Sequence, residues 1–207
     1  VTRTSFAMRD FPGGTLRTAV TAGTNAGRDE PGVLILPGSP ADMDWNFGPL
    51  VTNTGILLAR QLAMRGLRVL RYDPPGRGGS TLETELTPER SVAALGQAHR
   101  LLKGANRPVW WIAHGDAALT ALLAARSLKP RGIILLSPPG VSMGEVLLQQ
   151  AKEGLENRRV EAGRVAATLA YLRAGIKALV AGDPRPAVPE LVEAGAVLAI
   201  TRLFHPG

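Results

Sequence analysis

Short apolar runs alternate with longer segments of helical periodicity along the first two thirds of the chain. Runs at 32–36, 67–72, 109–113 and 132–136 are rich in Val, Ile and Leu, as is typical of strands buried on both faces. Two more strands are predicted at 1–8 and 15–22, around a Pro-Gly-Gly turn. Helices are predicted over 56–65, 87–103 and 116–128. This alternation predicts an α/β fold, with a mostly parallel sheet flanked by helices.

The pattern changes after Ser142. Helices are predicted over 145–155, 159–181 and 189–203, and no further strand is expected. We therefore expect a core over residues 1–141 and a helical region over 142–207. No apolar run is long enough to span a membrane, and the chain begins at Val1 without a signal-peptide pattern. A soluble protein of the cytoplasm is expected, with an organellar matrix as the alternative, and the chain is read as a processed product or a fragment.

The charge balance is basic, with a formal net charge of +7. The arginines are scattered, and Arg158-Arg159 is their one adjacent pair. This scatter favours an ordinary basic surface, and an anionic partner such as RNA or an acidic membrane surface stays open as an alternative. Aromatic residues make up 4% of the chain, which argues against a base-stacking platform. Trp110 and Trp111 are adjacent on a strand and point to opposite faces, so both can be core residues.

Metal and cofactor chemistry finds little support in the composition. The chain has no cysteine, so disulfides and thiolate ligands are excluded. Its three histidines, His99, His114 and His205, are far apart in the sequence. We expect no metal and no cofactor.

The segment His114-Gly115-Asp116 joins a predicted strand to a predicted helix, and the small residues Ala113 and Ala117 flank it. A strand that turns sharply into a helix between small residues resembles the nucleophile elbow of the α/β-hydrolase superfamily. The resemblance implies a nucleophilic serine at the centre of the turn. Here that position is Gly115, which adopts a strained backbone conformation but carries no nucleophile.

Further segments resemble the same superfamily, in the expected order. They are PGSP at 37–40, which resembles the oxyanion-hole loop, LLARQLAMRGLRVLRYDPPGRGGS at 57–80, the elbow helix to 125, and GIILLSPPG at 132–140. The resemblance implies an oxyanion hole made by the backbone amides of Ser39 and Asp116. It also implies substrate contacts at Gly38, His114 and Trp45, and a helical lid over 142–207.

The same resemblance implies a seventh strand with an acid and an eighth with a histidine, and neither appears before Gly207. The fold is thus expected to be a truncated α/β-hydrolase fold. His205 follows no predicted strand, and the hydroxyls of Ser39, Ser80 and Ser137 have no evident base partner.

These observations favour a protein without a complete catalytic triad, acting as a non-catalytic interaction or assembly subunit. A partner protein or a second copy is expected to cover the open sheet edge at 132–136. A small acyl ligand at the oxyanion-hole amides is a further expectation. Two alternatives stay open: a fragment of an ester or amide hydrolase that takes its acid and histidine from another chain, and a basic RNA-associated subunit.

Overall fold

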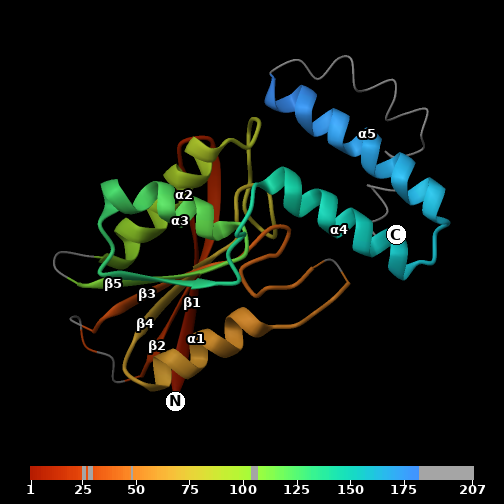
Figure 1. Ribbon diagram of the computed structural model, residues 1–207. Helices are drawn as coiled ribbons and strands as arrows, with labels where there is room; N and C mark the ends of the chain where they lie inside the picture. The colour runs from red at the N-terminus through yellow and green to blue at the C-terminus, as the bar shows by residue number, and fades with distance from the viewer. Residues whose placement is uncertain (25–26, 28–29, 48, 104–106, 182–207) are drawn as a thin grey trace. The chain divides into compact units, whose positions relative to one another are not determined.

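A six-stranded sheet organises the N-terminal part of the protein (Figure 1). The computed structural model describes residues 1–24, 27, 30–47, 49–103 and 107–181. Within them the strands are β1 (Thr2–Phe11), β2 (Gly14–Gly23), β3 (Gly32–Leu36), β4 (Arg68–Tyr72), β5 (Val109–His114) and β6 (Gly132–Leu136). Their order across the sheet is β1-β2-β4-β3-β5-β6. Strands β3 to β6 run parallel, and β2 is antiparallel to both its neighbours, so the predicted mostly parallel sheet is confirmed.

Helices cover both faces of this sheet. Helix α1 (Thr54–Met64) packs on one face, while α2 (Pro88–Lys103) and α3 (Ala117–Leu128) pack on the other (Figure 1). Strand β3 shows why both faces need cover, because Leu34 and Leu36 join the α2–α3 core whereas Val33 and Ile35 join the α1 core. The continuous apolar run thus forms the doubly buried strand that it predicts.

Two sequence predictions need correction in this sheet. Strands β1 and β2 are longer than predicted, because their pairing runs from Thr2↔Gly23 to Phe11↔Gly14. Trp110 is not a core residue: it is 39% exposed, whereas Trp111 is fully buried. The Trp110 ring lies over Gly132 of β6, where an added Cβ would come within 2.2 Å of the indole. On this face of β5, Ile112 joins the α1 core, whereas Trp110 stays outside that core and its ring covers the neighbouring Gly132.

The protein divides into two compact units, Val1–Pro138 and Pro139–Gly207. The second unit contains α4 (Met143–Asn157) and α5 (Ala162–Val180). Helix α4 begins with a capping box, in which Ser142 Oγ accepts from Glu145 N and a Glu145 carboxylate oxygen accepts from Ser142 N. The helix predicted over 189–203, and His205, lie outside the described residues.

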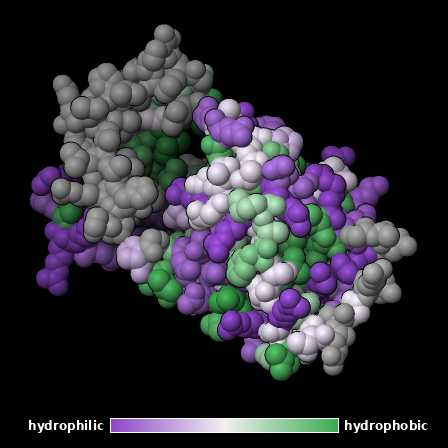
Figure 2. Space-filling model, turned by 180° about the vertical axis from the view of Figure 1, so that it is seen from behind, coloured by the Kyte–Doolittle hydropathy of each residue, from purple (hydrophilic) through white to green (hydrophobic). Residues whose placement is uncertain are grey.

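The surface of the first unit mixes the two kinds of residue, since hydrophilic and hydrophobic side chains are interspersed on the face that Figure 2 shows. Among the described helices, none combines the length and the apolar character that crossing a membrane requires.

Candidate active site at the elbow between β5 and α3

The corner between β5 and α3 has the geometry of the predicted elbow. Gly115 lies there with φ of 56°, in the left-handed region. Its amide donates to Leu136 O at 2.9 Å, which fixes the corner to the end of β6. A Cβ added at Gly115 would meet Gly38 Cα at 3.9 Å, an ordinary van der Waals contact. The position therefore has room for a side chain. A non-glycine residue there would be destabilised only by the left-handed backbone conformation.

The loop that follows β3 approaches the elbow closely. A Cβ at Gly38 would come within 2.8 Å of His114 O and 3.1 Å of Asp116 Oδ1. Only a glycine fits between these atoms without a shift of the backbone. The sequence-predicted residues Gly38, Ser39, His114, Gly115 and Asp116 are thus brought together at one corner of the sheet.

The Asp116 side chain occupies a position that the sequence does not indicate. One of its carboxylate oxygens, Oδ1, accepts a hydrogen bond from Ser39 N at 2.7 Å. Ser39 N is one of the two backbone donors expected to form the oxyanion hole. An ionised acceptor makes this a short, charge-assisted bond. The Ser39 amide is therefore bonded within the chain in this structure, and its role as an oxyanion-hole donor stays a prediction.

Trp45 and His114 form a stacked pair beside the elbow. Their ring centroids are 4.8 Å apart with an interplanar angle of 26°. Trp45 has φ of 63°, so its backbone is held in a strained conformation that places the indole there. The pairing gives His114 a packing role next to Gly115.

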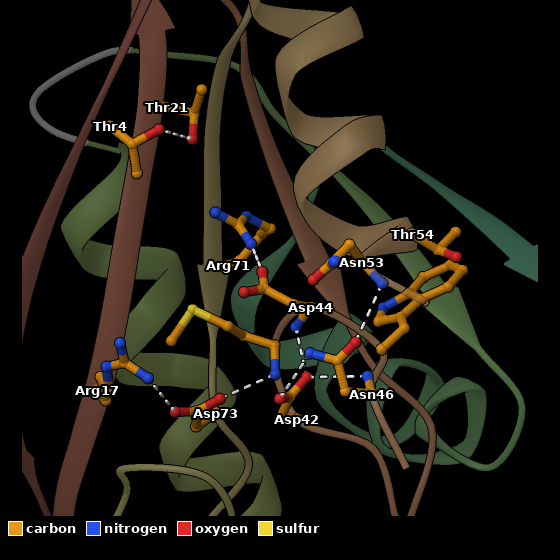
Figure 3. A network of polar contacts seen from close by, with 12 residues as sticks. Thr4, Arg17, Thr21, Asp42, Asp44, Asn46, Asn53, Thr54, Arg71 and Asp73 are labelled. Atoms are coloured by element: carbon orange, nitrogen blue, oxygen red, sulfur yellow. Dashed lines mark hydrogen bonds and ion pairs between the residues drawn. The ribbon is translucent and has the colours of Figure 1, made fainter. Parts of the chain in front are cut away.

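Three aspartates hold the loop that carries Ser39 (Figure 3). Asp42 accepts from Asp44 N at 2.8 Å and from Asn46 N at 3.0 Å, which closes a local turn. Asp73, at the end of β4, accepts from Met43 N at 2.8 Å and is buried. The loop is therefore fastened both to itself and to the sheet.

The third aspartate, Asp44, pairs with an arginine inside the protein. Arg71 of β4 is fully buried and forms an ion pair with the Asp44 carboxylate (Figure 3). Burial lowers the pKa of Arg71 to about 10, and the nearby carboxylates of Asp73 and Asp42 partly offset that effect. At neutral pH the guanidinium keeps its charge. The stability of the folded protein therefore depends on the carboxylates that compensate this buried charge.

The glycine-rich loop after β4 wraps around the Asp73 carboxylate. Asp73 Oδ2 accepts from Gly79 N at 2.8 Å, and a Cβ at Gly78 would come within 2.4 Å of the carboxylate. Ser80 is buried and its hydroxyl donates to Asp73 O at 2.7 Å while accepting from Arg17 N at 2.9 Å. These bonds occupy the hydroxyl that the sequence offered as a substitute nucleophile.

A cavity of about 120 Å³ opens beside the elbow. Ser39 and Asp116 contribute to its lining, whereas Gly38, His114 and Trp45 do not belong to the described residues that line it. Its other polar lining side chains are Tyr72, Arg77, Ser91 and Thr120. Burial raises the pKa of Tyr72, so its hydroxyl stays protonated. This volume is below the roughly 300 Å³ at which most small-molecule sites begin.

Sequence reasoning predicted Ser39 and Asp116 at this corner but missed the other polar residues that line the cavity. Arg77 lies in the glycine-rich loop after β4. The sequence pattern of that loop predicts a turn, but it does not indicate that Arg77 lines a cavity. Among the described residues, no group of three or more His, Cys, Asp or Glu side chains could hold a metal ion.

A parallel sheet with helices on both faces, and a tight turn between its β5 strand and the next helix, define the class of α/β proteins with a nucleophile-elbow corner. The sequence matches the alpha/beta hydrolase family over residues 33–206. The chain belongs to this family. A search of curated proteins finds no match to the sequence.

Solved structures share this fold at low sequence identity. The α/β hydrolase GrgF from Penicillium sp. sh18 is 19% identical with a TM-score of 0.56, over 75% of this chain and 53% of that one. Est1E from Butyrivibrio proteoclasticus, solved with ferulic acid, is 18% identical with a TM-score of 0.57, over 69% and 56%. Proline iminopeptidase from Mycobacterium smegmatis is 20% identical with a TM-score of 0.53, over 96% and 60%. The matches thus span between 53% and 60% of these proteins' lengths, and they show the fold alone.

Proposed function

We propose that this chain is a non-hydrolytic member of the alpha/beta hydrolase family that acts by protein interaction. The observation that carries the proposal is the hydrogen bond from Ser39 N to the Asp116 carboxylate at 2.7 Å, beside an elbow that has Gly115 in place of a nucleophile. Catalysis by an oxyanion hole needs donors aimed at a charge that develops on the substrate. Here one of the two donors, Ser39 N, already donates to the Asp116 carboxylate. The negative charge of that carboxylate would repel an incoming oxyanion.

One observation favours the alternative, an ester or amide hydrolase fragment whose acid and histidine come from another chain and whose serine has been replaced. The elbow keeps its left-handed backbone, and the space around Gly115 would accept a serine side chain. The two proposals differ in what a restored serine would do. In a hydrolase unit whose acid and histidine come from another chain, the elbow would still be shaped to react with an acylating or phosphonylating reagent, whereas in the non-hydrolytic chain the Asp116 charge would oppose that reaction.

The test compares the natural chain, Gly115→Ser and Gly115→Ser with Asp116→Ala. Each is treated with a fluorophosphonate and with p-nitrophenyl acetate, and covalent adducts are read by intact mass. We expect no adduct on the natural chain and none on Gly115→Ser. Gly140→Ser is the matched control, since a Cβ added at Gly140 would meet nothing within 4 Å and the position is not part of the elbow sequence. An adduct at position 115 of the Gly115→Ser variant, with none on the Gly140→Ser control, would overturn the proposal in favour of the hydrolase unit.

The proposed interaction uses the edge of the sheet at β6. Ile134 on this strand is 47% exposed, and Leu119, Leu122 and Leu123 of α3 are also exposed. The three leucines follow helical spacing, so they form one apolar stripe on α3. Strand β6 pairs with β5 on one side and has no strand on its other side among the described residues. An open apolar edge favours addition of a strand from a partner polypeptide.

Native mass spectrometry at micromolar concentration tests this interaction. We expect a stable complex, with a second copy or another polypeptide, that Ile134→Lys weakens. Met8→Lys is the control, because Met8 is 51% exposed on β1, the opposite edge strand. A stable monomer in all three samples would exclude the proposed interaction at this edge.

A further inference from the structure

Four basic side chains line a cavity at the opposite end of β5 from the elbow. The cavity has a volume of about 320 Å³ and lies where β5 begins at Val109. Its basic lining residues are Lys103, Arg107, Lys129 and Arg131. None of the described residues that line it carries a carboxylate. A cleft lined by charges of one sign concentrates its potential and attracts ions of the opposite sign.

A buried histidine adds a neutral donor to this lining. His99 is 3% exposed, and its Nδ1 accepts a hydrogen bond from Trp111 Nε1 at 3.1 Å. That bond assigns the ring proton to Nε2, on the side of the ring away from Trp111. His99 Nε2 is buried and has no hydrogen-bond partner among the described residues. A buried N–H without an acceptor is costly, and because His99 belongs to the lining of the cavity, a small movement of its ring toward a ligand oxygen would satisfy it.

Helix ends alone do not account for this arrangement. Lys103 ends α2 and Lys129 caps α3, and cations near helix C-termini are favourable for the helix dipole. Arg131, however, precedes β6, and its amide donates to Val109 O at 2.7 Å. The Arg107 guanidinium donates to Leu102 O at 2.6 Å, which holds it in place. The four cationic residues come from different parts of the fold, and what they have in common is that they line this cavity.

We propose that this cavity binds the phosphate group of a small phosphorylated molecule. A phosphate offers several acceptor oxygens and up to two negative charges, which suits ammonium, guanidinium and imidazole N–H donors together. The volume lies at the lower end of the range for small-molecule sites, so it suits a phosphate with a small attached group. The site is separate from the elbow, and it does not depend on the function proposed there.

Isothermal titration of the full chain with inorganic phosphate and pyrophosphate, at ionic strength held constant with chloride, tests the proposal. We expect saturable binding that is about tenfold weaker in Lys103→Gln with Lys129→Gln, because each ammonium contributes a few-fold. The matched control is Lys152→Gln with Lys177→Gln, which removes the same charge from exposed positions on α4 and α5. We expect the control to bind as the natural chain does. Equal weakening in both double variants would reduce the effect to net charge and overturn the proposal.

The His99 ring reports binding directly, without a substitution in the core. We expect its Nε2 resonance to shift in nitrogen NMR as phosphate is added, with the same midpoint as the titration. Binding without that shift would place the phosphate elsewhere and overturn the assignment. Binding of an RNA oligonucleotide with a steep salt dependence, where neither phosphate nor pyrophosphate binds, would assign the site to a nucleic-acid backbone and also overturn it.

Discussion

Replacing Asp44 by asparagine should destabilise the protein through Arg71 rather than through Asp44 itself. The substitution keeps the size of the side chain and removes its charge. Arg71 is fully buried, whereas the Asp44 side chain is 26% exposed. Removing one partner of a fully buried ion pair typically costs about 3–5 kcal/mol, since the other charge stays buried and uncompensated. Because water reaches Asp44, we expect a loss of about 2–3 kcal/mol in the free energy of unfolding.

Urea denaturation followed by tryptophan fluorescence measures this loss, and a melting experiment should show a Tm lower by about 6 °C for a chain of this size. Asp10→Asn is the control, since Asp10 is an exposed acid on β1 and its loss should change stability by less than about 0.5 kcal/mol. Arg71→Met together with Asp44→Asn removes both charges of the pair and should therefore cost less than the two single substitutions added together. If Asp44→Asn matches the Asp10→Asn control, the pair does not compensate the Arg71 charge and the reasoning fails.

Three further predictions concern single positions. Gly38→Ala should cost about 1–3 kcal/mol of stability by denaturation, because its Cβ would crowd His114 O, while Gly140→Ala should cost almost nothing. Ser80→Ala should cost about 1–3 kcal/mol in the same assay, since it leaves two backbone groups without their partner, and a neutral result would contradict the bonds described for its hydroxyl. Burial, then Lys103 and Arg100, lower the pKa of His99, so the stability that depends on its neutral form is complete above the unfolded pKa of about 6.5 and falls as the pH drops below it. Stability measured between pH 7.5 and 5.0 should therefore fall less steeply in His99→Gln, and identical slopes would refute this account.

The strands and helices of the sheet could be predicted because hydrophobic periodicity reports burial directly. The runs at Gly32–Leu36 and Gly132–Leu136 form strands with the predicted bounds. The ends of β1 and β2 could not be placed, because hairpin pairing extends past the apolar residues that mark a strand. Trp110 was misplaced for a related reason: alternation gives two faces to a strand, but it does not say whether both faces are covered.

The corner at Gly115 could be predicted from local sequence, since small residues and a strand-to-helix switch lie within a few positions of each other. The side-chain bond from Asp116 to Ser39 could not, because these residues are 77 positions apart and their contact depends on the register of β3 against β5. The basic cavity is a similar case. Its cations look scattered along the sequence, and only the sheet brings Lys103, Lys129 and Arg131 to one end of β5.

The hydrogen bond between Ser39 N and the Asp116 carboxylate also means that a carboxylate ligand from solution must compete with Asp116 for the Ser39 amide. A group tethered within the same chain acts at an effective concentration in the millimolar range or above, even with a flexible tether. Asp116 lies at the start of a helix and needs no long tether, so it has the advantage over a dissolved acid of equal intrinsic affinity. Free carboxylates at micromolar levels would leave this amide with the acceptor that the chain itself supplies.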